Sequence, residues 1–278
     1  MESSDVDGPS QPFLARHEFA IRRLHSLSGL VPVGAYMLVH LVTNASVLNG
    51  AGTFQKNVYT IHSLGALLPL VEWTFIFLPI LFHAIVGVGI AVGMVPNTSD
   101  YAYAANRRFT LQRWTGLLAF AFIVWHVFHM HGWFHFDAWL AHVAEPYGGA
   151  KFRPYNAAST SGLALQHPGM IAWYAVGVLA CVFHLANGLW TMGITWGVWT
   201  SPRAQAWALK LCAVIGLGLA AVSMSALYGM WAVGRGEALS RAVEVENRMY
   251  QTRIETGELQ PNELKRSHVE TRDQSTTN

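Results

Sequence analysis

Four histidines each lie deep inside a separate, long apolar stretch of the chain. They are His40 in GAYMLVHLVTN, His83 in LPILFHAIVG, His126 in AFIVWHVFH and His184 in ACVFHLANG. An ionisable side chain is costly in an apolar environment, and within a membrane such residues are usually functional. Four positions of this kind, in four segments, ask for one shared explanation that any fold of the chain has to accommodate.

The apolar stretches are long enough to cross a bilayer. Of the 278 residues, 52% are hydrophobic and only 12% are charged, which is too apolar for an ordinary soluble domain of this size. A spanning helix needs about 20 apolar residues. We predict five, at residues 25–48, 64–95, 109–131, 169–199 and 206–233. The expected fold class is an all-α integral membrane protein, a bundle of five transmembrane helices.

The spans divide the chain into three parts. We predict a disordered N-terminal leader at residues 1–20, a transmembrane domain at 21–233 and a polar C-terminal tail at 234–278. The leader is acidic and contains Ser, Gly and Pro, a composition typical of disorder, and it lacks the apolar region of a cleavable signal peptide. Within the tail, EALSRAVEVENRMYQTRIE is expected to form a short polar helix, and the remainder to be disordered.

Basic residues beside the spans predict how the chain is oriented. Placing the N-terminus in the cytoplasm puts only Lys56, Lys151 and Arg153 on the outer side. Eight cations then share the inner side: Arg16, Arg22, Arg23, Arg107, Arg108, Arg113, Arg203 and Lys210. Cytoplasmic loops carry an excess of Lys and Arg, so we predict a cytoplasmic N-terminus. Nothing in the charge distribution suggests a nucleic-acid partner.

The depths of the four histidines match in pairs. His40 lies eighteen residues after Arg22, and His126 lies nineteen residues after Arg107. At about 1.5 Å per residue, both histidines are roughly 27 to 29 Å from the inner side. His83 and His184 precede the inner ends of their spans by twelve and thirteen residues, or about 18 to 20 Å. We therefore expect two histidine pairs at two levels.

Two weak internal similarities connect the same spans. LHSLSG (24–29) resembles LQRWTG (111–116), and a deep histidine follows the glycine by eleven residues in the first case and by ten in the second. FHAIVG (82–87) resembles FHLANG (183–188), each a Phe-His pair with a glycine four residues later. The odd spans therefore match each other, and so do the even spans.

Paired imidazoles from two sets of helices are what two stacked haems with two histidine ligands each require. The iron takes one nitrogen from each side, and the macrocycle fills the gap between the helices. Gly87 and Gly188, one turn past His83 and His184, would leave room for the porphyrin. The bundle is thus expected to surround two b-type haems, with the four deep histidines as axial iron ligands. The structural alternative is that each histidine hydrogen-bonds a neighbouring helix.

The remaining histidines carry weaker signals. His25 lies near the inner boundary and is a candidate for contact to a haem propionate or to quinone; an interfacial role is the alternative. The neighbouring Arg22 and Arg23 are candidates for contacts to haem propionates, with simple topology signals as the alternative. Four more histidines gather toward the outer side: His129, His131, His135 and His142. We do not expect a metal site there, because Gly132 and the helix end interrupt a rigid ligand face. The two cysteines fall inside predicted spans as apolar packing residues.

Together these motifs resemble a known family. RRLHSLSGLVPVGAYMLVHLVTN, LVEWTFIFLPILFHAIVG, LQRWTG with WHVFH, and FHLANGLW with TWG and TSPRAQ are similar to the five-helix, di-haem cytochrome b subunit of succinate dehydrogenases and fumarate reductases of the Bacillus-like type. The likeness covers about residues 19–233. It implies a multi-pass subunit of a bacterial inner membrane that anchors a flavoprotein and an iron-sulfur subunit and passes electrons between the latter and a quinone, with menaquinone the expected species.

The resemblance also assigns roles to particular residues. It implies that His83 and His184 hold the haem proximal to the soluble subunits, and that His40 and His126 hold the distal one. It places a glutamate on the second span, where Glu72 is the only acidic residue between positions 19 and 99. Eleven residues of regular helix would put Glu72 and His83 on one face. We predict that Glu72 relays protons to or from quinone; a carboxylate among lipid headgroups is the alternative.

Dicarboxylate chemistry needs partner subunits, because the chain has no Gly-rich dinucleotide fingerprint and no cysteine set for an iron-sulfur cluster. Two other functions remain open at this point. One is the cytochrome b anchor of a different membrane oxidoreductase, such as a hydrogenase or formate dehydrogenase. The other is a haem-free membrane anchor whose histidines form a proton relay.

Overall fold

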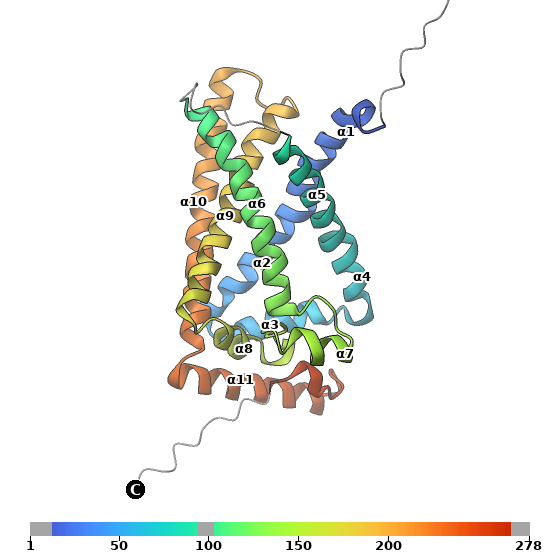
Figure 1. Ribbon diagram of the computed structural model, residues 1–278. Coiled ribbons are helices and arrows are strands. Elements are labelled where there is room, and N and C mark those ends of the chain that lie inside the picture. The colour runs from blue at the N-terminus through green and yellow to red at the C-terminus, as the bar shows by residue number, and fades with distance from the viewer. Residues whose placement is uncertain (1–12, 94–102, 268–278) are drawn as a thin grey trace, which may run out of the picture.

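The structure is a computed structural model that describes residues 13–93 and 103–267. Within these ranges all regular secondary structure is helical, and five helical segments are long and apolar enough to cross a membrane (Figure 1). They are Arg16–Asn49, Gly65–Val92, Ala104–His131, Pro168–Thr195 and Pro202–Val233. The prediction of an all-α membrane protein with five spans is confirmed.

Three of the spans are unbroken helices and two are not. The unbroken ones are α6 (Ala104–His131), α9 (Pro168–Thr195) and α10 (Pro202–Val233). The first span consists of α1 (Phe13–Ser28), the π segment η1 (Gly29–Gly34), α2 (Ala35–Ala45) and the 3-10 turn η2 (Ser46–Asn49). The second consists of the 3-10 turn η3 (Gly65–Leu67), α4 (Leu68–Glu72), the π segment η4 (Trp73–Phe77) and α5 (Leu78–Val92).

The first π segment accounts for an irregularity in the sequence repeat. His40 follows Gly29 by eleven residues, and in the third span the matching interval, from Gly116 to His126, is ten. One extra residue in an α-helix would rotate His40 by about 100° relative to its counterpart. A π turn takes up an additional residue, and η1 lies between Gly29 and His40. The widened turn therefore returns the two histidines to equivalent positions.

The second π segment overturns one expectation. The prediction that Glu72 and His83 share a helix face assumed eleven residues of regular α-helix. That assumption is wrong, because η4 lies between the two residues and changes the angular register. The two π segments also contact each other, so the irregular parts of the first and second spans lie side by side.

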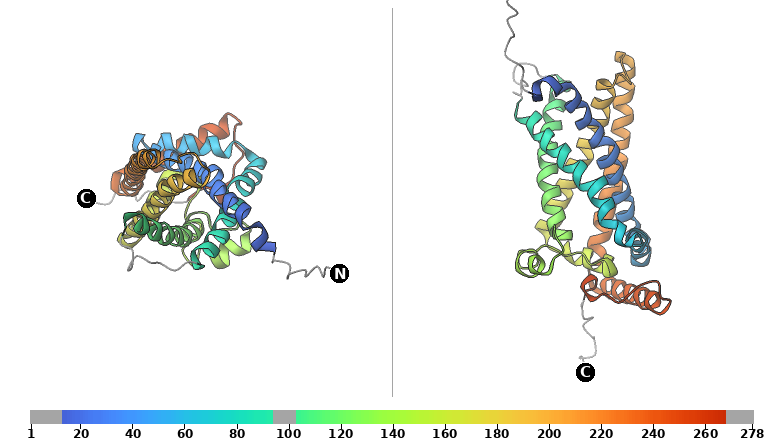
Figure 2. Two further views of the ribbon diagram at one scale, coloured as in Figure 1. Left: turned by 90° about the horizontal axis from the view of Figure 1, so that it is seen from above. Right: turned by 90° about the vertical axis from the view of Figure 1, so that its right-hand side faces the viewer.

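The spans pack in a fixed order of neighbours. α9 packs against both α6 and α10, α10 packs against α2, and α1 packs against α5 (Figures 1 and 2). Many large apolar side chains on the outside of the bundle remain exposed, Val92, Ile85 and Leu217 among them. Exposed apolar side chains of this number are expected where lipid covers the surface.

A layer of short helices closes one end of the bundle, which we call the α11 end. It contains α3 (Ala51–His62), α7 (Asp137–Trp139), α8 (Ala157–Ala164) and α11 (Gly236–Glu255). Three shorter elements complete it: η5 (Leu140–Ala144), η6 (Pro154–Asn156) and η7 (Glu263–Lys265). α11 lies across the ends of the spans (Figure 2) and contacts α3 and α8.

The structure refines the predicted boundaries at both ends of the chain. The helix predicted in the tail is confirmed as α11. The prediction of disorder beyond it is wrong up to Ser267, whose backbone N–H donates to Asn156 Oδ1 at 3.0 Å. Residues 13–20, which were assigned to the disordered leader, belong to α1. Positions 1–12 of the predicted leader and 268–278 of the predicted tail lie outside the described residues.

A buried carboxylate holds α11 against α8. Glu246 is fully buried, and its Oε1 accepts from the backbone N–H groups of Ala158 and Ser159 at 2.6 and 3.1 Å. Its Oε2 accepts from the Ser159 hydroxyl at 2.5 Å. Burial raises the pKa of Glu246, and the hydrogen bonds oppose that shift. The side chain thus satisfies donors at the start of α8, which no side chain of α8 itself caps.

We predict that Glu246→Ala loosens the α11 end. The change strips a buried hydroxyl and two backbone N–H groups of their acceptor, at a cost of about 1–3 kcal/mol. Glu246→Gln keeps one oxygen for the N–H groups and should cost less. Thermal unfolding of the detergent-solubilised protein, with limited proteolysis of α11, measures the effect. Glu244→Ala, on the exposed face of the same helix, is the matched control; equal stability of Glu246→Ala and this control would contradict the prediction.

Candidate functional site in the core of the bundle

The four deep histidines meet in two pairs inside the bundle. The ring centroids of His83 and His184 lie 6.0 Å apart, and we call these residues pair 1. Those of His40 and His126 lie 5.9 Å apart and form pair 2. Pair 1 is nearer the end where α1 lies, and pair 2 is nearer the α11 end. The structure therefore brings together the residues that the depth comparison paired.

The imidazoles of pair 1 are held in the same way by the two halves of the repeat. His83 Nδ1 lies 2.9 Å from the carbonyl oxygen of His25, and His184 Nδ1 lies 2.9 Å from the carbonyl oxygen of Gln112. A carbonyl oxygen can only accept, so each Nδ1 carries the proton. Each Nε2 is then left with its lone pair, which is the form that binds a metal.

Two glycines allow the odd spans to approach these rings. A Cβ atom on Gly29 would lie 2.3 Å from His83 Cε1, and one on Gly116 would lie 2.7 Å from His184 Cε1. Contacts below about 3 Å are repulsive for carbon atoms, whose attraction is best at about 3.5–4.0 Å. Gly29 and Gly116 occupy the same place in the repeat, as do His25 and Gln112. Sequence reasoning did not assign Gly29, Gly116 or Gln112 to the site, although the LHSLSG and LQRWTG alignment contained the signal.

Pair 2 is surrounded by aromatic rings. Tyr36, one turn before His40, has its ring centroid 5.6 Å from that histidine. Phe122, one turn before His126, is also at 5.6 Å. The Tyr174 hydroxyl lies 3.2 Å from His126 Nδ1, and this tyrosine was not singled out from the sequence. A large aromatic environment of this kind suits a flat apolar group.

The residues of each pair fit a metal that brings most of its ligands with it. Two imidazoles that share one metal, each at about 2.0 Å, have centroids about 6 Å apart, close to both observed separations. No group of three or more His, Cys, Asp or Glu side chains in the described part of the chain could hold a metal by itself. Haem iron needs only axial ligands from the protein, so paired histidines match this group.

The other predicted contacts lie around pair 1. The His25 ring stacks on His83, with centroids 4.1 Å apart and planes 9° apart, so it belongs to the cluster itself. Arg23 donates to the Thr195 carbonyl at 3.1 Å, and Arg22 pairs with Glu18 at 2.7 Å. Propionate or quinone contacts from His25, Arg22 and Arg23 stay predictions.

At Gly87 and Gly188, where we predicted room for a porphyrin, protein side chains lie close to the glycine. A Cβ atom on Gly87 would lie 3.0 Å from His25 Nε2, and one on Gly188 would lie 3.4 Å from Gln112 Nε2. Protein side chains thus pack at these glycines, which hold the even spans close to the odd ones. Whether Gly87 and Gly188 also make room for a porphyrin stays a prediction.

Glu72 is connected to pair 2 through a tyrosine. It interacts electrostatically with Tyr36, whose ring contacts His40. This electrostatic interaction is the link between the carboxylate and pair 2. The predicted role of Glu72 in proton transfer is compatible with this link and stays a prediction.

The histidines of the α11 end form a separate group. The rings of His131 and His135 have centroids 4.1 Å apart, and His62 of α3 interacts with both. Burial lowers the pKa of His62 to about 4, and it also lowers the pKa of His135. These two side chains are thus neutral at pH 7.

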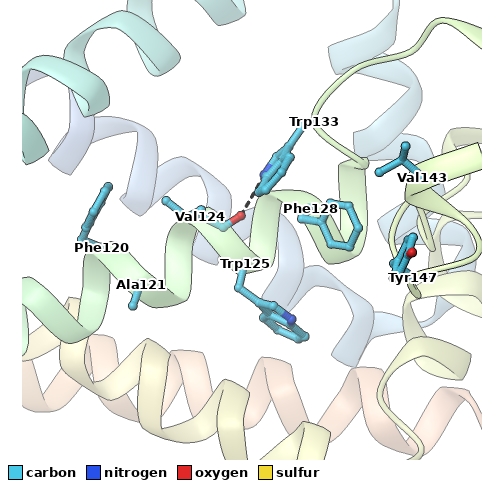
Figure 3. Close-up of a pocket in the computed structure, with 8 residues that line it drawn as sticks. All are labelled: Phe120, Ala121, Val124, Trp125, Phe128, Trp133, Val143 and Tyr147. Atoms are coloured by element: carbon cyan, nitrogen blue, oxygen red, sulfur yellow. Dashed lines mark hydrogen bonds between the residues drawn. The ribbon is translucent and has the colours of Figure 1, made fainter. Parts of the chain in front are cut away.

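An apolar groove lies on the outside of α6, near the α11 end. It has a volume of about 510 Å³ and is lined in part by Trp133, whose Nε1–H donates to the Val124 carbonyl at 2.9 Å (Figure 3). Its walls are Phe120, Ala121, Val124, Trp125, Phe128, Trp133, Val143 and Tyr147. The groove has no charged residue in its walls and is apolar throughout.

Five membrane-spanning helices with two half-buried histidine pairs between them define a class of polytopic helical membrane protein with paired histidines between its spans. No family model matches the chain. It is 36% identical over 211 residues to the succinate dehydrogenase cytochrome b558 subunit of Bacillus subtilis (strain 168), and the match covers 76% of this chain and 96% of that protein. The chain belongs to the family of succinate dehydrogenase cytochrome b subunits, as the sequence motifs predicted.

The close approach at Gly29 and Gly116 can be tested directly. We predict that Gly29→Ala or Gly116→Ala displaces the imidazole of pair 1 that it touches, because the new methyl group overlaps the ring. Gly89→Ala is the matched control, since a Cβ there meets nothing within 4 Å. Yield of folded protein and the haem absorption spectrum of the purified complex are the measurements. Wild-type yield and spectrum in Gly116→Ala would show that the ring is not held as described.

Proposed function

We propose that the chain is the membrane-anchoring, electron-transferring subunit of a succinate:quinone oxidoreductase and that it binds two haems b. Pair 1, His83 and His184, holds one haem, and pair 2, His40 and His126, holds the other. The observation that carries this proposal is the geometry of the pairs: two rings about 6 Å apart at each level, with both Nδ1 atoms of pair 1 committed to carbonyl oxygens. Family membership supports it independently.

The chain's own residues fix the orientation of the ligands. The backbone carbonyls of His25 and Gln112 hold the rings of pair 1 in one tautomer, which keeps Nε2 available and raises its basicity. The spans enclose both pairs between apolar side chains. When bound, each haem supplies a one-electron iron couple whose potential depends on these surroundings.

Two stacked sites give electrons a route across part of the membrane. Pair 1 lies toward the end that carries α1 and most of the basic residues near the spans, which we infer to be cytoplasmic in a bacterial inner membrane. A flavoprotein and an iron-sulfur subunit bind at that end, and pair 1 is then the proximal site. Pair 2 is the distal site, and quinone, with menaquinone the expected species, exchanges electrons there. The succinate and fumarate chemistry belongs to the soluble partners.

The proton-relay alternative is less well supported. A relay along the four deep histidines needs hydrogen bonds between the members of each pair, and no hydrogen bond joins His40 to His126, or His83 to His184, within the described structure. The similarity to a succinate dehydrogenase subunit argues against an anchor for a hydrogenase or formate dehydrogenase.

We predict that each histidine pair binds one haem. His83→Ala or His184→Ala removes one haem b, and His40→Ala or His126→Ala removes the other, because no nearby group can replace an axial ligand. Haem stoichiometry and the reduced-minus-oxidised spectrum decide this. His142→Ala, an exposed histidine of the α11 end, should keep both haems. Two haems with an unchanged spectrum in any of the four variants would refute that residue's assignment.

We predict a role for Glu72 in proton transfer at the distal site. Quinone takes up protons together with electrons, and Glu72 interacts electrostatically with Tyr36, whose ring contacts His40. Glu72→Gln preserves the shape but cannot carry a proton, so both haems should remain while succinate:quinone turnover falls at least about tenfold, a barrier change of about 1.4 kcal/mol. Glu237→Gln, on the exposed face of α11, is the control. Full turnover in Glu72→Gln would exclude an essential proton role.

A further inference from the structure

One imidazole of pair 2 is held by a side chain rather than by the backbone. His126 Nδ1 lies 3.2 Å from the Tyr174 hydroxyl, and the same hydroxyl lies 2.8 Å from His129 Nδ1. The two rings of pair 1, by contrast, both bond to carbonyl oxygens. Counted back from His83 as Tyr174 is from His184, the residue on the second span is Trp73, although the π segment η4 shifts the register there.

The three side chains form an enclosed unit. Tyr174 is 5% exposed and His129 is 4% exposed. Trp125 stacks on His129, with centroids 4.7 Å apart and planes 15° apart, and Phe122 packs edge-on against Tyr174. Figure 3 shows Trp125 leaving α6 on the side opposite to Trp133. The Tyr174 hydroxyl and His129 Nδ1 are 2.8 Å apart, so they form a direct hydrogen bond with no water between them.

Metal binding at His126 would set the direction of both hydrogen bonds. A neutral imidazole that binds iron through Nε2 carries its proton on Nδ1, so Nδ1–H of His126 donates to the Tyr174 oxygen. The hydroxyl proton of Tyr174 is then free to donate to His129 Nδ1, and His129 carries its own proton on Nε2. Donation to His129 increases the negative charge on the Tyr174 oxygen, which makes it a stronger acceptor for His126.

We propose that Tyr174, supported by His129, is a positioning residue that lowers the reduction potential of the distal haem. The inference rests on the proposed function, in which His126 is an axial ligand. A stronger acceptor at Nδ1 makes the imidazole a better electron donor to the metal, and that stabilises the oxidised iron. Backbone carbonyls take this part at pair 1, so at pair 2 the acceptor is a side chain that a substitution can remove without changing pair 1.

Redox titration of the assembled, membrane-extracted complex tests the proposal. Tyr174→Phe keeps the ring packing and removes the hydroxyl, so the distal haem potential should rise, by up to about tenfold in its reduction equilibrium or about 59 mV for one electron. His129→Phe leaves the hydroxyl in place as a weaker acceptor and should give a smaller rise. The proximal haem is the internal control in each variant. Tyr228→Phe, on the exposed surface of α10, is the matched control and should change neither potential.

The outcomes separate this inference from the proposed function. The distal component is identified as the one lost in His126→Ala, and its low-spin EPR signal should shift in Tyr174→Phe because the ring is free to rotate. A wild-type distal potential and EPR signal in Tyr174→Phe, or an equal shift of both haems, would overturn the inference. If Tyr174→Phe does not assemble, His129→Phe decides by the same criteria. A wild-type complex without two haems would overturn the proposed function itself.

Discussion

An imidazole inside a membrane has two ring nitrogens, and the rest of this structure depends on how each is satisfied. In pair 1, one nitrogen of His83 and one of His184 donate to backbone carbonyls on the neighbouring odd span. That bond requires the helices to be close, and the closeness requires glycine at positions 29 and 116. The other nitrogen is left for a ligand between the helices. Helix spacing, glycine placement and ligand chemistry therefore follow from one constraint, since an unpaired polar group in this environment is expensive.

The two halves of the bundle use the same solution with small departures. The repeat places His25 and Gln112, Gly29 and Gly116, in equivalent positions, and the π segment η1 compensates for one added residue before His40. One departure is His25 opposite Gln112 beside pair 1, and others surround pair 2. Glu72 and Tyr36 accompany one histidine of pair 2, and Tyr174 accompanies the other. A repeat with local differences allows one fold to hold two similar sites with different electronic and protonic surroundings.

The α11 end shows that a polar tail can become part of a membrane protein's structure. Glu246 caps the start of α8 from another segment of the chain, and the chain beyond α11 remains in contact with it as far as Ser267. This layer covers the end of the bundle nearest pair 2. Its side chains satisfy donors at the ends of neighbouring helices.

Hydrophobicity and the spacing of four histidines were enough to predict five spans and the pairing of His40 with His126 and of His83 with His184, because span length and helical rise are properties of the local sequence. The motifs around those histidines were enough to predict the family. The tertiary structure decided what depends on contacts between segments. It showed which carbonyls orient the rings of pair 1, that Tyr174 bonds His126, and that π segments shift the register of the first two spans. A π turn and a long-range hydrogen bond leave no periodic signal in the sequence, since each depends on how neighbouring helices pack.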